Sequence, residues 1–150
     1  MKKTLVIALV LCLVLSSMSA FAVAENIIID GTTVTIPADM GTVREKDDRT
    51  FVPVRFVTEY LGCTVQYVDS QHSATITNPK TNISYFLMEN DKMLYVLSPV
   101  SGYAIEMDTR SFIDNAEGRM YIPVRFLAEA IGYTVGWDEA TQTVSLTAAK

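Results

Sequence analysis

A segment of 17 residues occurs twice in this chain, and this repeat restricts the fold more than any other feature of the sequence. Residues 51–67 read FVPVRFVTEYLGCTVQY, and residues 121–137 read YIPVRFLAEAIGYTVGW. The two segments are identical at eight positions, and most of the others exchange similar residues. Such a repeat predicts two copies of one supersecondary unit, at about residues 26–78 and 83–148.

Each copy contains the signals for one short helix. Proline has a fixed φ and no N–H to lose, so Pro53 and Pro123 are predicted to open the two helices. Gly62 and Gly132 stand where a helix ends in a left-handed residue. Helices of roughly nine residues do not persist alone in water, so both must pack on a sheet. The apolar faces predicted for this packing are Phe56, Val57, Tyr60 and Leu61 in the first copy, and Phe126, Leu127, Ala130 and Ile131 in the second.

Strand signals surround the two helices. Residues 26–29 and 33–36 flank Asp30-Gly31, which is a strong hairpin signal. The polar segments at residues 40–49 and 108–119 are predicted to be loops. The pattern predicts an α+β fold of antiparallel β-sheet units, each with one short packed helix, internally duplicated. Further strands are predicted at residues 74–77, 83–87, 92–97, 103–107 and 144–147.

The paired pattern resembles the copper amine oxidase N-terminal-like domain family. The resemblance rests on the Asp-Gly hairpin, the Pro-Val-Arg-Phe segment, Glu-x-x-Gly and Thr-Val-x-aromatic, and it covers nearly all of residues 25–150. The second copy fits best, whereas the first departs from the pattern at Cys63 and Val68. The resemblance implies a five-stranded antiparallel sheet with a packed helix, in an exported or cell-surface protein of a Gram-positive bacterium.

The first 24 residues have the three-part pattern of a secretory signal peptide. Lys2 and Lys3 precede an almost wholly apolar run at residues 5–15, and small residues follow. This run is shorter than the roughly 20 residues of a membrane-spanning helix. We expect cleavage after Ala22 or Ala24, with an uncleaved anchor as the alternative. The mature chain is therefore predicted to be secreted, extracellular or attached to the cell surface, with no integral membrane span.

The charge balance excludes some classes of partner. Without Lys2 and Lys3, the chain has 10 basic and 17 acidic residues, a net charge of −7. This argues against binding to nucleic acid or to anionic lipid. The mature chain keeps one cysteine, Cys63, so an internal disulfide is excluded. We expect a buried, inert thiol, with a reactive thiol or an intermolecular bridge as the alternative.

The repeated arginines are the most conspicuous polar residues of the motif. Arg55 precedes Glu59 by four residues, and Arg125 precedes Glu129 by four, so each pair shares a helix face. A structural ion pair, or an arginine that braces nearby loop carbonyls, is the favoured interpretation. The alternative is a pair of anion-binding or carboxylate-binding sites. The structural motif is thus Pro53, Arg55, Glu59, Gly62, Pro123, Arg125, Glu129 and Gly132.

No cofactor or metal site is predicted. The chain has one histidine, His72, so the histidine cluster of a copper amine oxidase cannot form within it. His72 is expected to be a solvated turn residue. Methionines can also bind copper, but those of this chain are scattered, and core packing is the favoured interpretation. The methionines considered are Met88, Met93, Met107 and Met120.

Aromatic residues are the remaining candidate ligand surface. Tyr67, Tyr133 and Trp137 would suit stacking on sugar rings or packing on a protein. The leading hypothesis is a non-catalytic extracellular or cell-envelope binding or scaffold module that contacts cell-wall polymer, glycan or a surface protein. One alternative is a small secreted hydrolase with carboxylates from Asp138, Glu139 or the Glu45 loop. A less favoured alternative is a metal-handling protein.

Overall fold

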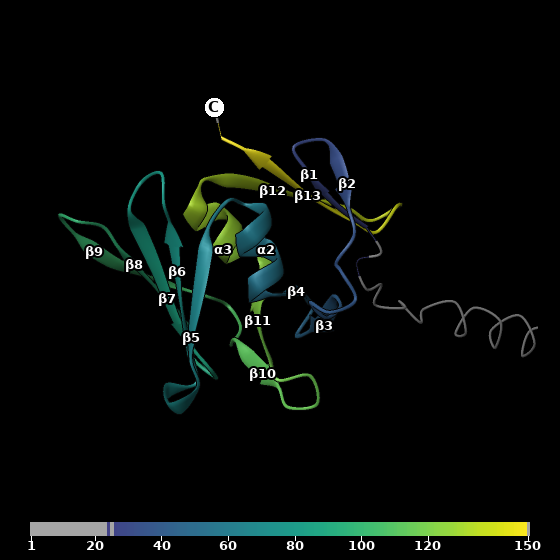
Figure 1. The fold of residues 1–150 in the computed structure, drawn as a ribbon. Coiled ribbons are helices and arrows are strands. Elements are labelled where there is room, and N and C mark those ends of the chain that lie inside the picture. The colour runs from purple at the N-terminus through teal and green to yellow at the C-terminus, as the bar shows by residue number, and fades with distance from the viewer. Residues whose placement is uncertain (1–23, 25, 150) are drawn as a thin grey trace, which may run out of the picture.

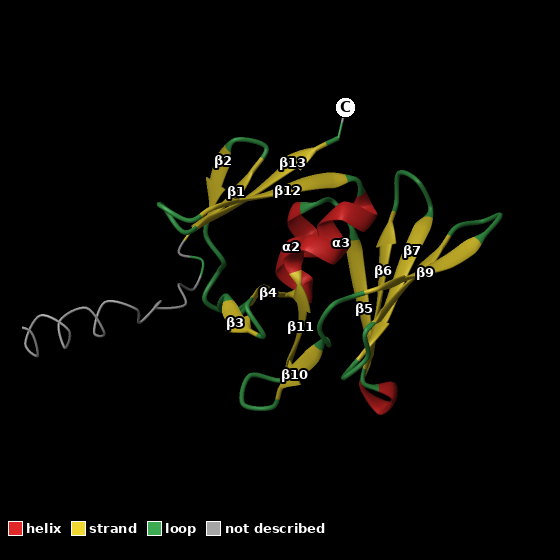
Figure 2. Cartoon of the chain, turned by 180° about the vertical axis from the view of Figure 1, so that it is seen from behind, coloured by secondary structure: helices red, strands yellow, loops and turns green. Residues whose placement is uncertain are grey.

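Three sheets surround two short helices in the computed structural model, which describes residue 24 and residues 26–149. The helices lie at the centre of the molecule in Figures 1 and 2. The predicted signal peptide, residues 1–24, lies outside the described residues except for Ala24. Within the described part of the chain, no helix has the length and apolar character needed to cross a bilayer. The predicted α+β class is confirmed.

Both helices begin directly after the predicted prolines, and the second ends at Ile131 as predicted, whereas the first ends at Tyr60, one residue before its predicted end at Leu61. They are α2 (Val54–Tyr60) and α3 (Val124–Ile131), and the proline of each copy directly precedes its helix. The glycine that follows each helix has a positive φ, 73° in the first copy and 109° in the second. This left-handed conformation is one that a residue with a Cβ adopts at a cost, which explains the glycine at both positions.

A central sheet joins the two copies of the repeat. Its strand order is β10-β11-β4-β3, and β4 and β11, which lead into the two helices, are antiparallel neighbours. Val52 faces Ile122 at the centre of this pairing, so the copies share a sheet and are not separate subdomains. The strands are β3 (Arg44–Lys46), β4 (Arg49–Pro53), β10 (Phe112–Asp114) and β11 (Arg119–Pro123).

The prediction of loops at residues 40–49 and 108–119 was therefore wrong in part. Each segment contains a short edge strand, β3 or β10, and the start of the strand that leads into a helix. Backbone hydrogen bonds to a strongly apolar neighbouring strand hold these segments in the sheet, and edge strands tolerate polar side chains. The polarity of a segment was thus a poor guide to whether it forms a strand, because the neighbouring strand decides whether its backbone is paired.

Two outer sheets flank the central one. One has the order β5-β6-β7-β8-β9 and is antiparallel throughout. The other has the order β12-β13-β1-β2, so the N-terminal hairpin of the first copy extends the last hairpin of the second copy (Figure 1). The strands are β1 (Asn26–Ile29), β2 (Thr32–Val34), β5 (Thr64–Val68), β6 (Ser73–Asn78), β7 (Ile83–Met88), β8 (Met93–Leu97), β9 (Gly102–Glu106), β12 (Tyr133–Asp138) and β13 (Thr143–Ala148), with a 3₁₀ turn η2 (Asp69–Gln71) between β5 and β6.

Two expectations about the sheets need correction. Strand β1 runs parallel to β13, so the sheets are not wholly antiparallel. These strands are far apart in the chain, and no tight turn forces them to be antiparallel. The family resemblance implied one five-stranded antiparallel sheet with a helix, but the five-stranded sheet here is one of three. Asp30 and Gly31 both have positive φ, as the predicted hairpin turn requires.

The core lies where the helices meet the three sheets. Phe56, Val57 and Leu127 are buried, as the helical pattern predicts. Phe126, Ala130 and Ile131 of the second face are only partly buried, and Tyr60 of the first face is 45% exposed although it was placed on the buried face. Its ring packs on the outer side of Phe56, with the centroids 4.8 Å apart.

Gly41 carries the segment between β2 and β3 close to the second copy. It has φ +99°, and an added Cβ would lie 2.8 Å from Tyr121 Oη and 3.0 Å from Glu117 Oε2. We expect Gly41→Ala to lower the free energy of unfolding by about 2–3 kcal/mol, through backbone strain and steric overlap. Urea denaturation measures this. Gly31→Ala is the matched control: φ is +79° there with no atom within 4 Å, so only the backbone cost of about 1 kcal/mol applies. Equal losses for the two variants would contradict the close approach at Gly41.

Candidate functional site

Two clefts open where the first turn of each helix meets the strand that follows it. Cleft 1, of about 600 Å³, lies beside α2 and β5, and the β10–β11 hairpin lines its other side. Cleft 2, of about 630 Å³, lies beside α3 and β12, and the β3–β4 hairpin lines its other side. Each cleft is therefore built from both copies of the repeat.

The two clefts use corresponding positions. Six lining positions of cleft 1 have a counterpart 70 residues later in cleft 2. The opposite walls are exchanged, since Arg119 lines cleft 1 and Arg49 lines cleft 2. The corresponding pairs are Pro53 and Pro123, Arg55 and Arg125, Val65 and Val135, Tyr67 and Trp137, Asp69 and Glu139, and His72 and Gln142.

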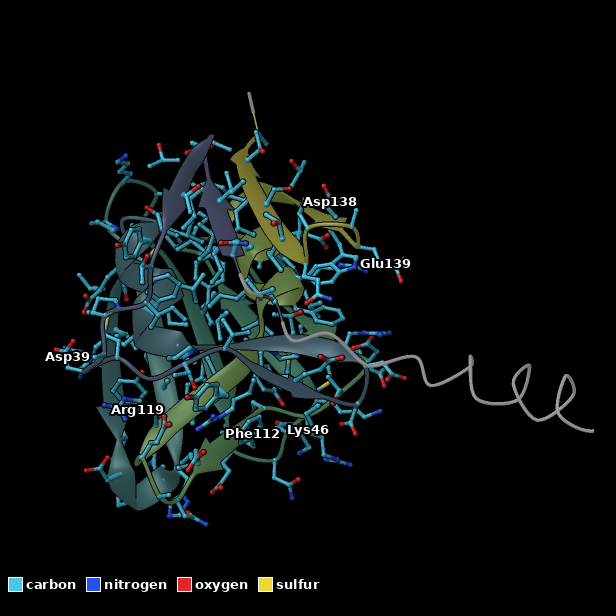
Figure 3. All side chains as sticks on the ribbon, turned by 90° about the vertical axis from the view of Figure 1, so that its right-hand side faces the viewer. Asp39, Lys46, Phe112, Arg119, Asp138 and Glu139 are labelled. Carbon is cyan, nitrogen blue, oxygen red and sulfur yellow. The ribbon has the colours of Figure 1, made fainter. Side chains whose placement is uncertain are left out.

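The clefts open on different sides of the molecule. Figure 3 shows Asp39 and Arg119, which line cleft 1, at the left of the molecule. Glu139, which lines cleft 2, lies on the opposite side. A ligand in one cleft would therefore not occupy the other.

Arg55 is exposed and lies against Tyr67 in cleft 1. Its guanidinium carbon is 5.7 Å from the centre of the Tyr67 ring, within the range of a cation–π contact. Burial raises the pKa of Tyr67, and the charge of Arg55 opposes that rise. The ring thus holds the guanidinium at the wall of the cleft.

The predicted ion pairs of the two helices do not form. Among the described residues, no ion pair joins Arg55 to Glu59 or Arg125 to Glu129. All four side chains belong to exposed residues, and an exposed pair gains little over solvation in water. Spacing along the helix permitted these contacts but did not make them favourable.

Three other charged or titratable side chains of cleft 1, Arg119, Glu117 and His72, contact protein partners, whereas the carboxylates of Asp39 and Asp69 make no ion pair among the described residues. Arg119 donates a hydrogen bond of 2.6 Å to the backbone oxygen of Asp39 and lies 3.5 Å from Glu117. Arg44 contacts the second Glu117 oxygen at 2.6 Å. His72 is exposed, as predicted, and its Nδ1 lies 2.6 Å from Glu89 Oε2.

Cleft 2 combines an open aromatic ring with charges of both signs. Trp137 is 44% exposed, and Arg125 beside it makes no ion pair with another described residue. Carboxylates of Glu45 and Glu139 also line this cleft. Glu45 Oε2 is buried and lacks a hydrogen-bond partner among the described residues. Cleft 2 therefore offers a stacking face, hydrogen-bond donors and hydrogen-bond acceptors together.

Two sequence candidates lie elsewhere. Tyr133 pairs with Ala148 in the sheet and lines neither cleft. Asp138 accepts hydrogen bonds from the backbone N–H groups of Ala140 and Thr141, so it shapes the turn after β12. Its carboxylate thus stabilises the turn, and this argues against the catalytic role considered for Asp138 in the hydrolase alternative.

The predicted site residues did not include the wall that each copy contributes to the cleft of the other copy. Arg49 and Arg119 are also 70 positions apart, just before the quoted repeat. Extending the repeat by two residues would have included them. That extension would still not have shown that each arginine lines the cleft of the other copy, since this follows from the pairing of β4 with β11.

Metal-ligating side chains do not cluster in the described part of the chain, where no group of three His, Cys, Asp or Glu residues is arranged around a common point. Cys63 is buried, and burial raises the pKa of its thiol, which lowers its reactivity at neutral pH. Met107 and Met120 are buried in the core, as core packing predicts, whereas Met88 is exposed.

Asp114 stabilises the β10–β11 turn that borders cleft 1. Backbone N–H groups of Glu117 and Ala116 and the guanidinium of Arg44 lower its pKa below the ordinary value of 3.8. Its contribution to stability is therefore present above that value and is lost as the pH falls through the lowered pKa. At pH values below 3.8, we expect the urea concentration at the unfolding midpoint to decrease as the pH is lowered, and to decrease less for Asp114→Asn. An identical acid profile for both proteins would contradict this role.

The fold and the two clefts define a small α+β domain whose concave surfaces carry arginine and aromatic side chains. A family model described as Copper amine oxidase N-terminal domain matches residues 28–146, and the chain belongs to this family. That domain is a non-catalytic accessory domain of the oxidases. No curated protein and no solved structure matches the chain.

Proposed function

We propose that this protein is a non-catalytic module of the cell envelope that binds a saccharide polymer through cleft 2. The observation that supports the proposal is the exposed ring of Trp137 within a cleft, beside Arg125, Glu45 and Glu139. An exposed tryptophan in a concave surface is costly to hydrate and is a frequent centre of binding energy.

The chemistry of a sugar ring fits these side chains. One face of the ring carries C–H groups that pack on an indole, and its hydroxyl groups both donate and accept hydrogen bonds. Arginine supplies donors only and carboxylates supply acceptors only, so a cleft with both suits hydroxyl groups. The two carboxylates of Glu45 and Glu139, in a protein with a surplus of acidic residues, favour an uncharged sugar over an anionic one in cleft 2.

Export and duplication belong to the same proposal. The apolar N-terminal segment, residues 1–24, supports secretion, and the repeated motif supports duplication of one ancestral unit. Fractionation of producing cells into medium, wall and membrane tests the location. We expect the processed protein in the medium or wall fraction. Recovery of the protein only from the cytoplasm would contradict export.

Binding is tested with purified cell wall and with a glycan array. We expect the folded protein to sediment with insoluble wall material and to retain neutral oligosaccharides on the array. Capture of a surface protein without any saccharide binding would support a scaffold role and contradict the saccharide proposal. Failure to bind any of these probes would contradict a binding module.

A hydrolase is the second candidate, because Glu45, Asp48 and Glu139 line the same cleft. Incubation of the protein with a bound polymer, followed by assay of new reducing ends, separates the two functions. We expect no release above that of a buffer control. Release that is lost in Glu139→Gln would establish a hydrolase and overturn the non-catalytic proposal.

A further inference from the structure

We propose that cleft 1 is a second ligand site that selects a carboxylate-bearing saccharide, so that one chain holds two chemically different parts of a polymer. The saccharide class rests on the proposed function, whereas the selection of a carboxylate rests on Arg55. The corresponding arginine in cleft 2 has a different environment, and the two sites are therefore expected to differ in specificity.

Arg55 is positioned to bind a carboxylate. Its guanidinium carbon lies 5.7 Å from the centre of the Tyr67 ring, and no carboxylate of the described residues pairs with it. A guanidinium that stacks on an aromatic face keeps its N–H edges free in its own plane. Those edges match the two oxygens of a carboxylate in a bidentate hydrogen bond. Because Tyr67 already restricts the side chain, binding costs less conformational entropy.

The neighbouring charges leave Arg55 as the cation available to a ligand in this cleft. Arg119 is occupied by the Asp39 backbone oxygen and by Glu117, and Glu117 is also balanced by Arg44. Asp39 and Asp69 line the cleft as well, make no ion pair among the described residues, and repel an anion. A free anion would therefore bind weakly, whereas a carboxylate on a sugar ring gains further contacts with Tyr67 and the cleft walls.

Cleft 2 has the same arginine position but disfavours a carboxylate. Arg125 shares its cleft with Glu45, Asp48 and Glu139, and none of these three carboxylates makes an ion pair among the described residues, against two such carboxylates in cleft 1. Arg49 pairs with Asp108 at 2.6 Å. The aromatic ring at the corresponding position, Trp137, is 44% exposed and has no arginine recorded over it among the described residues. Stacking on the ring thus dominates in cleft 2, and charge recognition dominates in cleft 1.

The opposite placement of the clefts permits both to be filled at once. Asp39 and Arg119 mark cleft 1 at the left of the molecule in Figure 3, and Glu139 marks cleft 2 at the right. A chain with two occupied sites would bridge two polymer strands or two segments of one strand, which raises avidity without new contacts.

Isothermal titration with two probes tests the inference. The probes are a glucuronic-acid tetrasaccharide and a neutral tetrasaccharide of glucose, applied to the full protein and to Arg55→Ala, Arg55→Lys and Arg125→Ala. We expect Arg55→Ala to weaken binding of the acidic probe by about tenfold or more, from the loss of a charged hydrogen bond. Arg55→Lys should restore this only in part, because lysine lacks the planar fork. Higher salt should weaken the acidic probe at cleft 1 but leave the neutral probe unchanged.

The outcomes separate the inference from the proposed function. Binding of the acidic probe that resists Arg55→Ala but is lost in Arg125→Ala would overturn the assignment to cleft 1. If the protein binds the neutral probe but not the acidic probe, the inference is overturned and the proposed function stands. If the protein binds the acidic probe through Arg55 but does not bind the neutral probe, the proposed role of cleft 2 is contradicted and the assignment of cleft 1 is supported. Urea denaturation checks that the exposed substitutions leave the protein folded.

Discussion

Phe56→Ala is expected to lower the free energy of unfolding by about 3–5 kcal/mol. Phe56 is 1% exposed and lies on α2 in the core between the sheets. Removing its ring leaves a cavity that the surrounding strands cannot close, so the lost transfer energy and the lost packing add. Urea denaturation followed by circular dichroism measures the change. In a domain of this size, the loss removes a large part of the total stability.

Tyr60→Ala on the same helix is the matched control. Tyr60 is 45% exposed, and its ring packs on that of Phe56 with the centroids 4.8 Å apart. We expect a loss of about 1 kcal/mol, the size of one aromatic pair at the surface. Similar losses for Phe56→Ala and Tyr60→Ala would contradict the packing of α2 and would favour the fully apolar face that the helical pattern predicts.

Trp137→Ala is expected to weaken binding of a neutral oligosaccharide by about 30-fold or more, the effect of removing one central aromatic contact. In the proposed function, the ring is the stacking face of cleft 2, and Arg125 and Glu139, which line the same cleft, would form hydrogen bonds with the ligand. Titration calorimetry measures the affinity of both proteins, and the intrinsic fluorescence of the single tryptophan provides a second measurement for the unsubstituted protein.

The control for this prediction separates local stacking from general surface hydrophobicity. Tyr103 is 59% exposed and lies on β9, the edge strand of the five-stranded sheet, outside both clefts. Tyr103→Ala should leave the affinity unchanged. Equal losses for the two variants would show that binding depends on exposed aromatic area in general, and cleft 2 would then not be the site.

The arginines show how far spacing along the chain can be trusted. Arg55 and Glu59 stand four residues apart, which favours contact on an isolated helix. In the fold, the start of α2 lies beside β5, and Tyr67 of that strand offers Arg55 a nearby ring. Tyr67 lies outside the helix, so the spacing rule for side-chain pairs on a helix does not consider it as a partner of Arg55. The competing partner is visible only once the chain is folded.

The candidate site was predicted in part for the same reason. Tyr67 and Trp137 were singled out as aromatics, and both line clefts, whereas Tyr133 lines neither. Alternation along a strand distinguishes two faces but does not say which face borders a cavity. That depends on the hairpin of the other copy, which forms the opposite wall.

The sequence by itself determined the repeat, the start and end of both helices and the α+β class. These features depend on residues close together in the chain: the fixed φ of proline, the positive φ of glycine and the spacing of apolar side chains. Only the tertiary structure decided that β4 pairs with β11, that β1 pairs with β13, and that a hairpin of one copy lines the cleft of the other copy. Such pairings bring together segments that are far apart in sequence, and the backbone hydrogen bonds that form them are available to every residue except proline.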